Sequence, residues 1–190
     1  NDRPRYSHLY VTSMQDSRQI HVERGCLPGH RCVSFVIPTL NAERLLRSCL
    51  ISIRMQDYPT ASIEILVADG GSTDRTCAIA AEHGASVLDA KGLMAEAAKR
   101  MAFDRAEGSY LALLDADNEI ADPTWLRRAV EALERHPEAL GFESYYLPHP
   151  AHTSLNRYLT ACLQISDPYA RCMAGRLRGG TLDAGGAEAW

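Results

Sequence analysis

Two carboxylates one residue apart, Asp115 and Asp117, follow an apolar run at residues 111–114. Side chains at positions i and i+2 of an extended backbone point to the same side, so both carboxylates could converge on one ligand. A pair of carboxylates completed by substrate phosphates is how proteins commonly bind Mg2+ or Mn2+. An isolated Asp-x-Asp has another interpretation, because aspartate often ends a strand by bonding nearby backbone amides. The metal hypothesis therefore depends on what surrounds the pair.

A second polar loop follows the apolar run at residues 63–68 and begins with Asp69 and two glycines. The Asp69 carboxylate could accept hydrogen bonds from a base or a ribose, and the glycines let another group approach the backbone closely. The alternative is a plain helix start with Ser72 or Thr73 as the N-cap. Capping accounts for Ser72 but not for an aspartate followed by two glycines.

Strand and helix patterns alternate around these loops. β-Branched and aromatic residues at 33–37 end at Pro38, which is typical of a buried strand that stops where a ladder donor is lost. Amphipathic helices are predicted after Asn41 and after Asp122, with these two residues as N-caps. Further strands are predicted at 63–68, 86–88, 110–114 and 139–147, and further helices at 75–83, 93–105 and 154–165.

Such alternation predicts an α/β fold with a mostly parallel, Rossmann-like sheet, right-handed crossovers and helices on both faces. Ligands of these sheets bind beyond the carboxyl ends of the strands. Three polar loops fall at those ends, at residues 38–43, 69–74 and 115–118. The shared edge favours the ligand-binding interpretation of Asp115 and Asp117.

Three motifs in these loops resemble the family 2 glycosyltransferases of the GT-A fold. They are Val-Ile-Pro-Thr-Leu-Asn-Ala-Glu at 36–43, Ala-Asp-Gly-Gly-Ser-Thr-Asp-Arg-Thr at 68–76 and Leu-Leu-Asp-Ala-Asp-Asn at 113–118. Gln-Asp-Tyr-Pro at 56–59 is also similar to that family. One such motif is a weak signal, but three in order on the expected elements are specific. The resemblance covers about residues 32–147.

The resemblance implies a nucleotide-diphospho-sugar donor, Mg2+ or Mn2+ as cofactor, and a saccharide, lipid-linked or other hydroxyl acceptor that attacks with inversion. Cell-envelope polysaccharide biosynthesis is the biological setting that it suggests. The implied donor-binding residues are Pro38, Thr39, Glu43, Asp69, Lys99, Asp115, Ala116 and Asp117.

Different roles are expected within this set. The resemblance implies that Asp69 would read the base. Asp117 lies farther from the strand and is the better direct metal ligand, whereas Asp115 would act through water or bind the ribose. Lys99 occupies the position where the family often has arginine and would place a cation near the phosphates; a solvated helix face is the alternative.

The general base expected from the resemblance is not assigned. In the family it lies well beyond the Asp-x-Asp, in an acidic motif near an acceptor-side helix. After Asp167 the acidic residues are Asp183 and Glu188, and the sequence around them does not match that motif. Asp183 is kept as the candidate.

Composition excludes several classes of function. With 20 basic and 24 acidic side chains and a net charge of -4, the chain has no broad basic surface for nucleic acid. It lacks a run of about 18 apolar residues, so no transmembrane segment is predicted. Its six cysteines are far apart and show no Cys-x-x-Cys spacing, which favours free thiols in a reducing cytoplasm. We expect a cytoplasmic protein and leave peripheral membrane attachment open.

We predict a poorly ordered lead-in at residues 1–31 with at most a short strand at 8–11, and a nucleotide-sugar-binding core at 32–147. Residues 148–190 would be the start of an acceptor-side region or a truncated tail. The leading hypothesis is a metal-dependent inverting glycosyltransferase, and the alternative is a truncated or inactive nucleotide-sugar-binding module that lacks the base. A phosphatase is disfavoured because its aspartate pair normally follows the first strand, and a sugar nucleotidyltransferase because its glycine- and arginine-containing first loop is absent.

Overall fold

The computed structural model describes residues 10–13, 29–139, 141–143, 181–182 and 188–189. The chain divides into two compact units, Ser7–Ser144 and Asn1–Tyr6 with Tyr145–Trp190. The second unit contains a small antiparallel sheet of β7 (Thr181–Leu182) and β8 (Glu188–Ala189). The helix predicted at 154–165 and the candidate base Asp183 lie outside the described residues.

The larger unit is built on a six-stranded sheet with the order β4-β3-β2-β5-β1-β6. Its strands are β1 (Tyr10–Ser13), β2 (Val33–Thr39), β3 (Ile63–Asp69), β4 (Ser86–Asp89), β5 (Tyr110–Leu113) and β6 (Gly141–Glu143). Its helices are α1 (Leu46–Arg54), the 3-10 turn η1 (Thr60–Ser62), α2 (Thr76–Glu82), α3 (Ala95–Phe103) and α4 (Trp125–Arg135). β2 to β5 are mutually parallel, and β1 pairs antiparallel with both β5 and β6.

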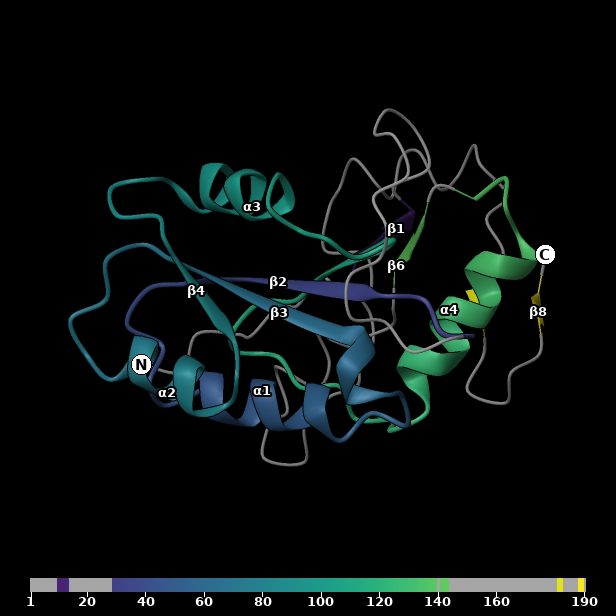
Figure 1. Cartoon of the computed structure of the whole chain (residues 1–190), viewed down its shortest axis with the longest axis horizontal. Coiled ribbons are helices and arrows are strands. Elements are labelled where there is room, and N and C mark those ends of the chain that lie inside the picture. The colour runs from purple at the N-terminus through teal and green to yellow at the C-terminus, as the bar shows by residue number, and fades with distance from the viewer. Residues whose placement is uncertain (1–9, 14–28, 140, 144–180, 183–187, 190) are drawn as a thin grey trace, which may run out of the picture. The chain divides into compact units, whose positions relative to one another are not determined.

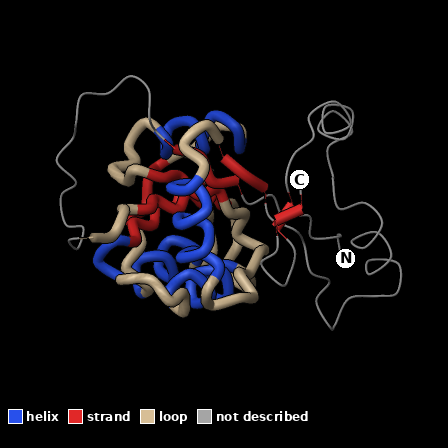
Figure 2. The backbone as a smooth tube through the Cα atoms, turned by 90° about the vertical axis from the view of Figure 1, so that its right-hand side faces the viewer, coloured by secondary structure: helices blue, strands red, loops and turns tan. Residues whose placement is uncertain are grey.

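Helices cover both faces of the sheet, as predicted (Figure 1; Figure 2). Alternate residues of each central strand point to opposite faces, so each strand serves two cores. On β2, Phe35 and Ile37 pack with α1, α2 and α4, whereas Val36 packs with α3. The strands read as continuous apolar runs because both of their faces are buried.

Two helices begin later than the sequence predicted. α1 begins at Leu46, because the Asn41 side chain bonds a neighbouring loop and does not cap the helix. α4 begins at Trp125, and the Asp122 carboxylate accepts the Thr124 N–H at 2.8 Å in the turn before it. In both cases the polar residue is satisfied outside the helix that it was expected to start.

The antiparallel part of the sheet was not predicted. β1 lies within the stretch 1–31, where the sequence suggested a strand at 8–11, and it inserts between β5 and β6. β6 is a short piece of the strand predicted at 139–147, most of which lies outside the described residues. Strand pairing of this kind joins segments about a hundred residues apart in sequence, and local patterns carry no record of it.

Cysteine chemistry differs from the expectation of free thiols. Cys49 and Cys77 are free, whereas Cys32 is disulfide-bonded. A reducing compartment does not account for that bond, and the cytoplasmic location stays a prediction. Within the residues that the structure describes, no helix has both the length and the apolar character needed to cross a bilayer.

Candidate functional site

The loops after β2 and β3 begin side by side because the two strands are adjacent and in register. Thr39, the last residue of β2, pairs with Asp69, the last residue of β3. The Gly70 N–H then donates to the Thr39 carbonyl at 2.8 Å, which extends the ladder past the strand ends. The predicted convergence of Thr39 and Asp69 at the carboxyl edge is therefore present in the structure. Pro38, also predicted to line the pocket, is half-buried one residue earlier and pairs with Ala68.

The Asp69 carboxylate is the centre of the loop after β3. Its Oδ2 accepts the backbone N–H groups of Gly71 at 3.0 Å and Ser72 at 2.8 Å. Its Oδ1 accepts the hydroxyls of Ser72 at 2.5 Å and Thr39 at 3.1 Å. Burial raises the pKa of the Asp69 carboxyl. The hydrogen bonds from Ser72, Gly71 and Thr39 lower the pKa by a larger amount, so it lies below its ordinary value. Asp69 is thus ionised and shapes the loop itself.

Asn41 joins the two loops in both directions. It adopts a left-handed conformation with φ 51°, which asparagine tolerates better than most residues. Its backbone N–H donates to Ser72 Oγ at 2.8 Å, and its Oδ1 accepts the Thr73 N–H at 2.9 Å. Ser72 and Thr73 are therefore engaged with Asp69 and Asn41, and neither of them caps α2.

Glu43 repeats the reciprocal pattern one turn later. Its backbone N–H donates to Asp74 Oδ2 at 3.2 Å, while its carboxylate accepts the Arg75 N–H at 3.1 Å. Between these contacts the Ala42 N–H donates to Thr76 Oγ1 at 2.8 Å. We call residues 39–43 and 69–76 together the double loop. Its two segments are joined by hydrogen bonds along their whole length, so they form one structural unit.

Two residues at the double loop were missed by the sequence reasoning. Leu40 is 62% exposed although it is a large apolar side chain, and a Cβ built on Gly70 would lie 3.7 Å from its Cδ1. Lys91, after β4, covers Gly71, where φ is +101° and an added Cβ would lie 2.9 Å from Lys91 Cγ. Backbone conformation and space together disfavour a side chain at Gly71. An apolar residue in an otherwise polar loop was the available signal for Leu40.

The Asp-x-Asp pair lies in a β-turn. β5 ends at Leu113, and the Leu114 N–H still donates to the Val36 carbonyl at 3.1 Å. The Asn118 N–H then donates to the Asp115 carbonyl at 3.0 Å, which closes a turn over residues 115–118. The prediction that an extended backbone aligns the two carboxylates is therefore wrong, because the chain turns at Ala116 and Asp117.

Negative charge gathers at the 115–118 turn. Cys49 of α1 contacts the turn, because its Sγ lies 3.8 Å from the Asp115 carbonyl oxygen. Burial raises the pKa of the Cys49 thiol well above its usual range, and the charges of Asp117, Glu119 and Asp115 raise it further. The thiol is therefore a neutral donor, buried near three acidic side chains.

The donor set at this turn fits a hard divalent cation. Asp115 and Asp117 are half-buried and have carboxylate oxygens as potential ligands. The part of the chain that the structure describes holds no group of three or more His, Cys, Asp or Glu arranged for a metal. Mg2+ and Mn2+ suit such a site because water and substrate phosphates complete their coordination. Asn118 is only 6% exposed, and its Nδ2 finds no partner among the described residues. A buried donor without a partner is unusual in a folded protein, and this one belongs to the last residue of the 115–118 turn.

Lys99 lies on α3, on the other face of the sheet from α1, α2 and α4. Its ammonium pairs with Glu96 at 2.9 Å, and its side chain is 16% exposed against 85% for Glu96. A fully solvated helix face does not describe this position, because most of the Lys99 side chain is covered. Its proposed role near a diphosphate stays a prediction.

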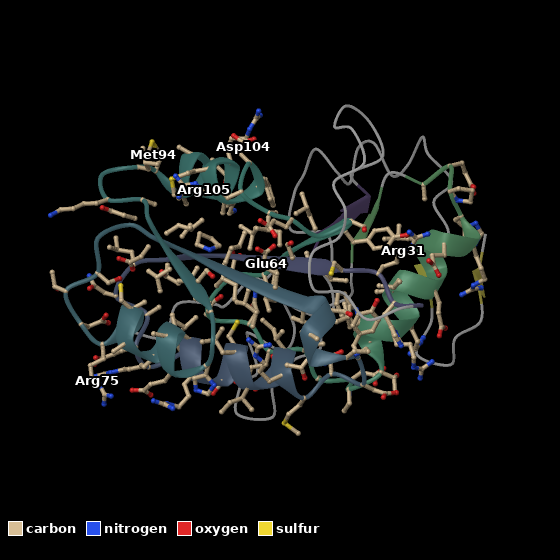
Figure 3. The ribbon with its side chains drawn as sticks, viewed as in Figure 1. Arg31, Glu64, Arg75, Met94, Asp104 and Arg105 are labelled. Carbon is tan, nitrogen blue, oxygen red and sulfur yellow. The ribbon has the colours of Figure 1, made fainter. Side chains whose placement is uncertain are left out.

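The carboxyl edge carries other side chains that project away from the sheet. In Figure 3 Arg75, before α2, and Met94, before α3, project outward at the same side of the molecule. Met94 is 83% exposed, and Leu93 beside it is 45% exposed. The edge therefore combines a charged double loop, an acidic turn and exposed apolar side chains.

The glycosyl transferase family 2 model matches residues 34–159, which include the double loop and the 115–118 turn. The chain belongs to glycosyl transferase family 2. Among curated members, the low-salt glycan biosynthesis hexosyltransferase Agl6 of Haloferax volcanii is 41% identical over 87 residues, 45% of this chain and 21% of that protein. Glycosyltransferase AglE of the same organism is 31% identical over 107 residues, 53% of this chain and 35% of that protein. The matched stretch thus spans about a fifth to a third of these family members.

Solved members of the family share the fold. The crystal structure of TarS from Staphylococcus aureus superposes with a TM-score of 0.51 at 27% identity, covering 56% of this chain and 20% of that one. A mannosyltransferase from Pyrobaculum calidifontis, solved with GDP-Man and Mn2+, gives the same TM-score and identity over 56% of this chain and 33% of that one. These likenesses confirm the predicted GT-A fold.

Proposed function

We propose that this chain is the donor-binding part of a metal-dependent inverting glycosyltransferase. The enzyme would transfer a sugar from a nucleotide-diphospho-sugar to an acceptor hydroxyl. The observation that carries the proposal is the position of the two candidate subsites. The double loop and the 115–118 turn follow β2, β3 and β5, which are neighbouring parallel strands. A ligand at this edge can contact both at once.

The double loop would bind the nucleoside. The exposed Leu40 offers an apolar surface for a base. Four hydrogen bonds to the Asp69 carboxylate come from within the double loop, and Asp69 would read the base by exchanging the hydroxyl of Ser72 or Thr39 for a donor on the base. Hydroxyl groups can rotate to make this exchange, whereas the backbone N–H groups stay in place.

The 115–118 turn would bind the diphosphate. Asp117 would be the direct metal ligand, and Asp115 would bind through water or contact the ribose. The unsatisfied Nδ2 donor of Asn118 would bond a phosphate oxygen. Mg2+ or Mn2+, when bound there, would supply positive charge to the leaving nucleoside diphosphate. Lys99 would add a cation, and a carboxylate such as Asp183 would take the proton of the acceptor hydroxyl.

Nucleoside diphosphate binding with and without Mn2+ tests the proposal. A ligand that binds only the native state raises the melting temperature, so UDP or GDP should raise it more when Mn2+ is present. Asp117→Asn should abolish the Mn2+-dependent part of that rise. Asp104→Asn is the matched control, because this exposed carboxylate pairs with Arg100 at the end of α3 and lies outside the site (Figure 3).

Unchanged affinity of Asp117→Asn for UDP and GDP in Mn2+ would overturn the site assignment. Release of free sugar from UDP- and GDP-sugars, or transfer to an added acceptor, separates an enzyme from the alternative of a nucleotide-sugar-binding module. Binding without any turnover favours the module.

A further inference from the structure

The inner face of α1 carries polar side chains that bond the backbone of the segment after β5. Cys49, Ser52 and Gln56 are spaced by three and four residues, so they follow one line along the helix and its C-terminal turn. They are buried, with 0%, 9% and 6% of their surfaces exposed. Buried polar side chains normally form hydrogen bonds with specific partners.

Each of the three contacts a different point of residues 115–126. Cys49 Sγ donates to the Asp115 carbonyl at 3.8 Å. Ser52 Oγ accepts the Ile120 N–H at 3.0 Å and donates to the Cys49 carbonyl at 2.7 Å. Cys49 thus contacts the first residue of the 115–118 turn, and Ser52 contacts the chain two residues after the turn.

Gln56 makes the most complete set of contacts. Its Nε2 donates to the carbonyls of Ser52 and Asp122, both at 3.2 Å, and its Oε1 accepts the Leu126 N–H at 3.0 Å. Leu126 is the second residue of α4, the position whose N–H an N-cap side chain normally satisfies. The N-cap residue of α4, Thr124, makes no side-chain capping bond to the helix. Gln56 therefore caps α4 from the turn that follows α1.

The same helix is connected to the double loop. α1 begins three residues after Glu43, whose backbone and carboxylate bond the segment after β3. One end of α1 thus follows the double loop, while its inner face holds the segment that contains Asp115 and Asp117. A shift of that segment against α1 would change the distance between the two subsites.

We propose that Cys49, Ser52 and Gln56 are positioning residues that set the 115–118 turn against the double loop, so that one nucleoside diphosphate reaches both. This inference rests on the proposed function. It assigns Gln56, within the Gln-Asp-Tyr-Pro segment, to the metal-dependent step of donor binding even though its side chain bonds only backbone groups of residues 52, 122 and 126.

The test compares three variants of the full chain for UDP and GDP affinity with and without Mn2+. Gln56→Leu keeps a similar side-chain volume and removes all three hydrogen bonds. Ser52→Ala is a smaller change that removes the acceptor for the Ile120 N–H. Arg54→Ala is the matched control, because Arg54 is on α1 but donates to the His83 and Gly84 carbonyls at the end of α2.

Gln56→Leu should lose the Mn2+-dependent gain in nucleotide affinity by roughly 10- to 100-fold, the usual effect of removing a group that orients metal ligands. Its metal-free nucleotide affinity should fall much less than the Mn2+-dependent gain, since the hydrogen bonds that join the two segments of the double loop come from residues of those segments. The EPR spectrum of Mn2+ bound with nucleotide should change in this variant and in Ser52→Ala, and not in Arg54→Ala.

Two results would overturn the inference and identify which step failed. If the wild type gains affinity from Mn2+ and both Gln56→Leu and Ser52→Ala keep that gain, the positioning role is wrong while the proposed function stands. If the wild type shows no gain from Mn2+ with either nucleotide, the proposed function itself fails. Should Gln56→Leu not fold, Ser52→Ala alone decides.

Discussion

Replacing Asp69 tests the physical account of the double loop most directly. Asp69→Ala removes one acceptor group from four donors, two backbone N–H groups and two hydroxyls. The hydroxyls can rotate to other partners or to water, but the N–H groups of Gly71 and Ser72 cannot. A hydrogen bond to a charged group contributes roughly 1.5–3 kcal/mol, and water reaches this half-buried loop, so we expect a loss of about 3 kcal/mol in the free energy of unfolding.

Asp69→Asn should be much milder. The asparagine carbonyl can still accept from the Gly71 and Ser72 N–H groups, while its amide donates to the hydroxyl oxygens of Thr39 and Ser72. The variant then loses only the charge of the carboxylate, which corresponds to about 1 kcal/mol. The assay is urea unfolding at pH 7 followed by circular dichroism, with the free energy obtained by linear extrapolation.

The pH dependence of these variants separates charge from shape. The pKa of Asp69 is lower in the folded protein than its ordinary value of about 3.9, so its charge stabilises the fold above that pH. This contribution is lost as the pH falls through the folded-state pKa. The difference in stability between wild type and Asp69→Asn should therefore be full at neutral pH and shrink below about pH 4.

Two results would refute this reasoning. An Asp69→Ala variant within about 0.5 kcal/mol of the wild type, the usual range of surface substitutions, would mean that water replaces the carboxylate without cost. A wild-type advantage over Asp69→Asn that stays constant down to about pH 3 would mean that the charge of Asp69 contributes nothing to folding.

Two glycine substitutions extend the predictions. Gly71→Ala should destabilise the protein by about 1–2 kcal/mol and weaken nucleotide binding, because φ is +101° and the new Cβ would lie 2.9 Å from Lys91 Cγ; adding Lys91→Ala should recover only part of the unfolding free energy, and full recovery would show that backbone strain is absent. Gly108→Ala should cost more than about 2 kcal/mol of stability, since its Cβ would lie 2.6 Å from Ser34 Oγ and 2.7 Å from Ser34 N. Because Gly108 precedes β5 at the opposite edge of the sheet, the folded variant should keep wild-type UDP or GDP affinity by calorimetry; an unchanged urea midpoint would contradict the steric argument.

Local patterns were sufficient for the central strands and for the edge that carries the site. Val33 to Ile37 and Ile63 to Ala68 are largely apolar on both faces, with Ser34 and Glu64 as the polar members, and a strand of that kind fits a sheet that is covered on both sides. Once the strands are parallel, Asp69 and the 115–118 turn must fall on one edge. The family motifs then named the same residues from an independent source.

Roles that depend on distant partners were not predictable. Asn41 and Asp122 have the composition of N-caps, but Asn41 bonds a loop that lies some thirty residues later in the sequence. Gln56 lies in a motif similar to the family, but the sequence predicted no role for it. Its partners at Asp122 and Leu126 come close to it only when the chain folds. The alignment of Asp115 and Asp117 was derived for a strand, whereas the backbone closes a turn there.

By itself, the sequence determined the strand–helix alternation, the parallel centre of the sheet and the chemistry at its carboxyl edge. Hydrophobic periodicity and turn residues are local properties, so they can be read without coordinates. The tertiary structure alone decided which polar groups satisfy one another: the double loop, the capping of α4 by Gln56 and the insertion of β1 beside β5. Hydrogen bonds form between groups that are close in space, and that proximity exists only after the sheet and its helices have packed.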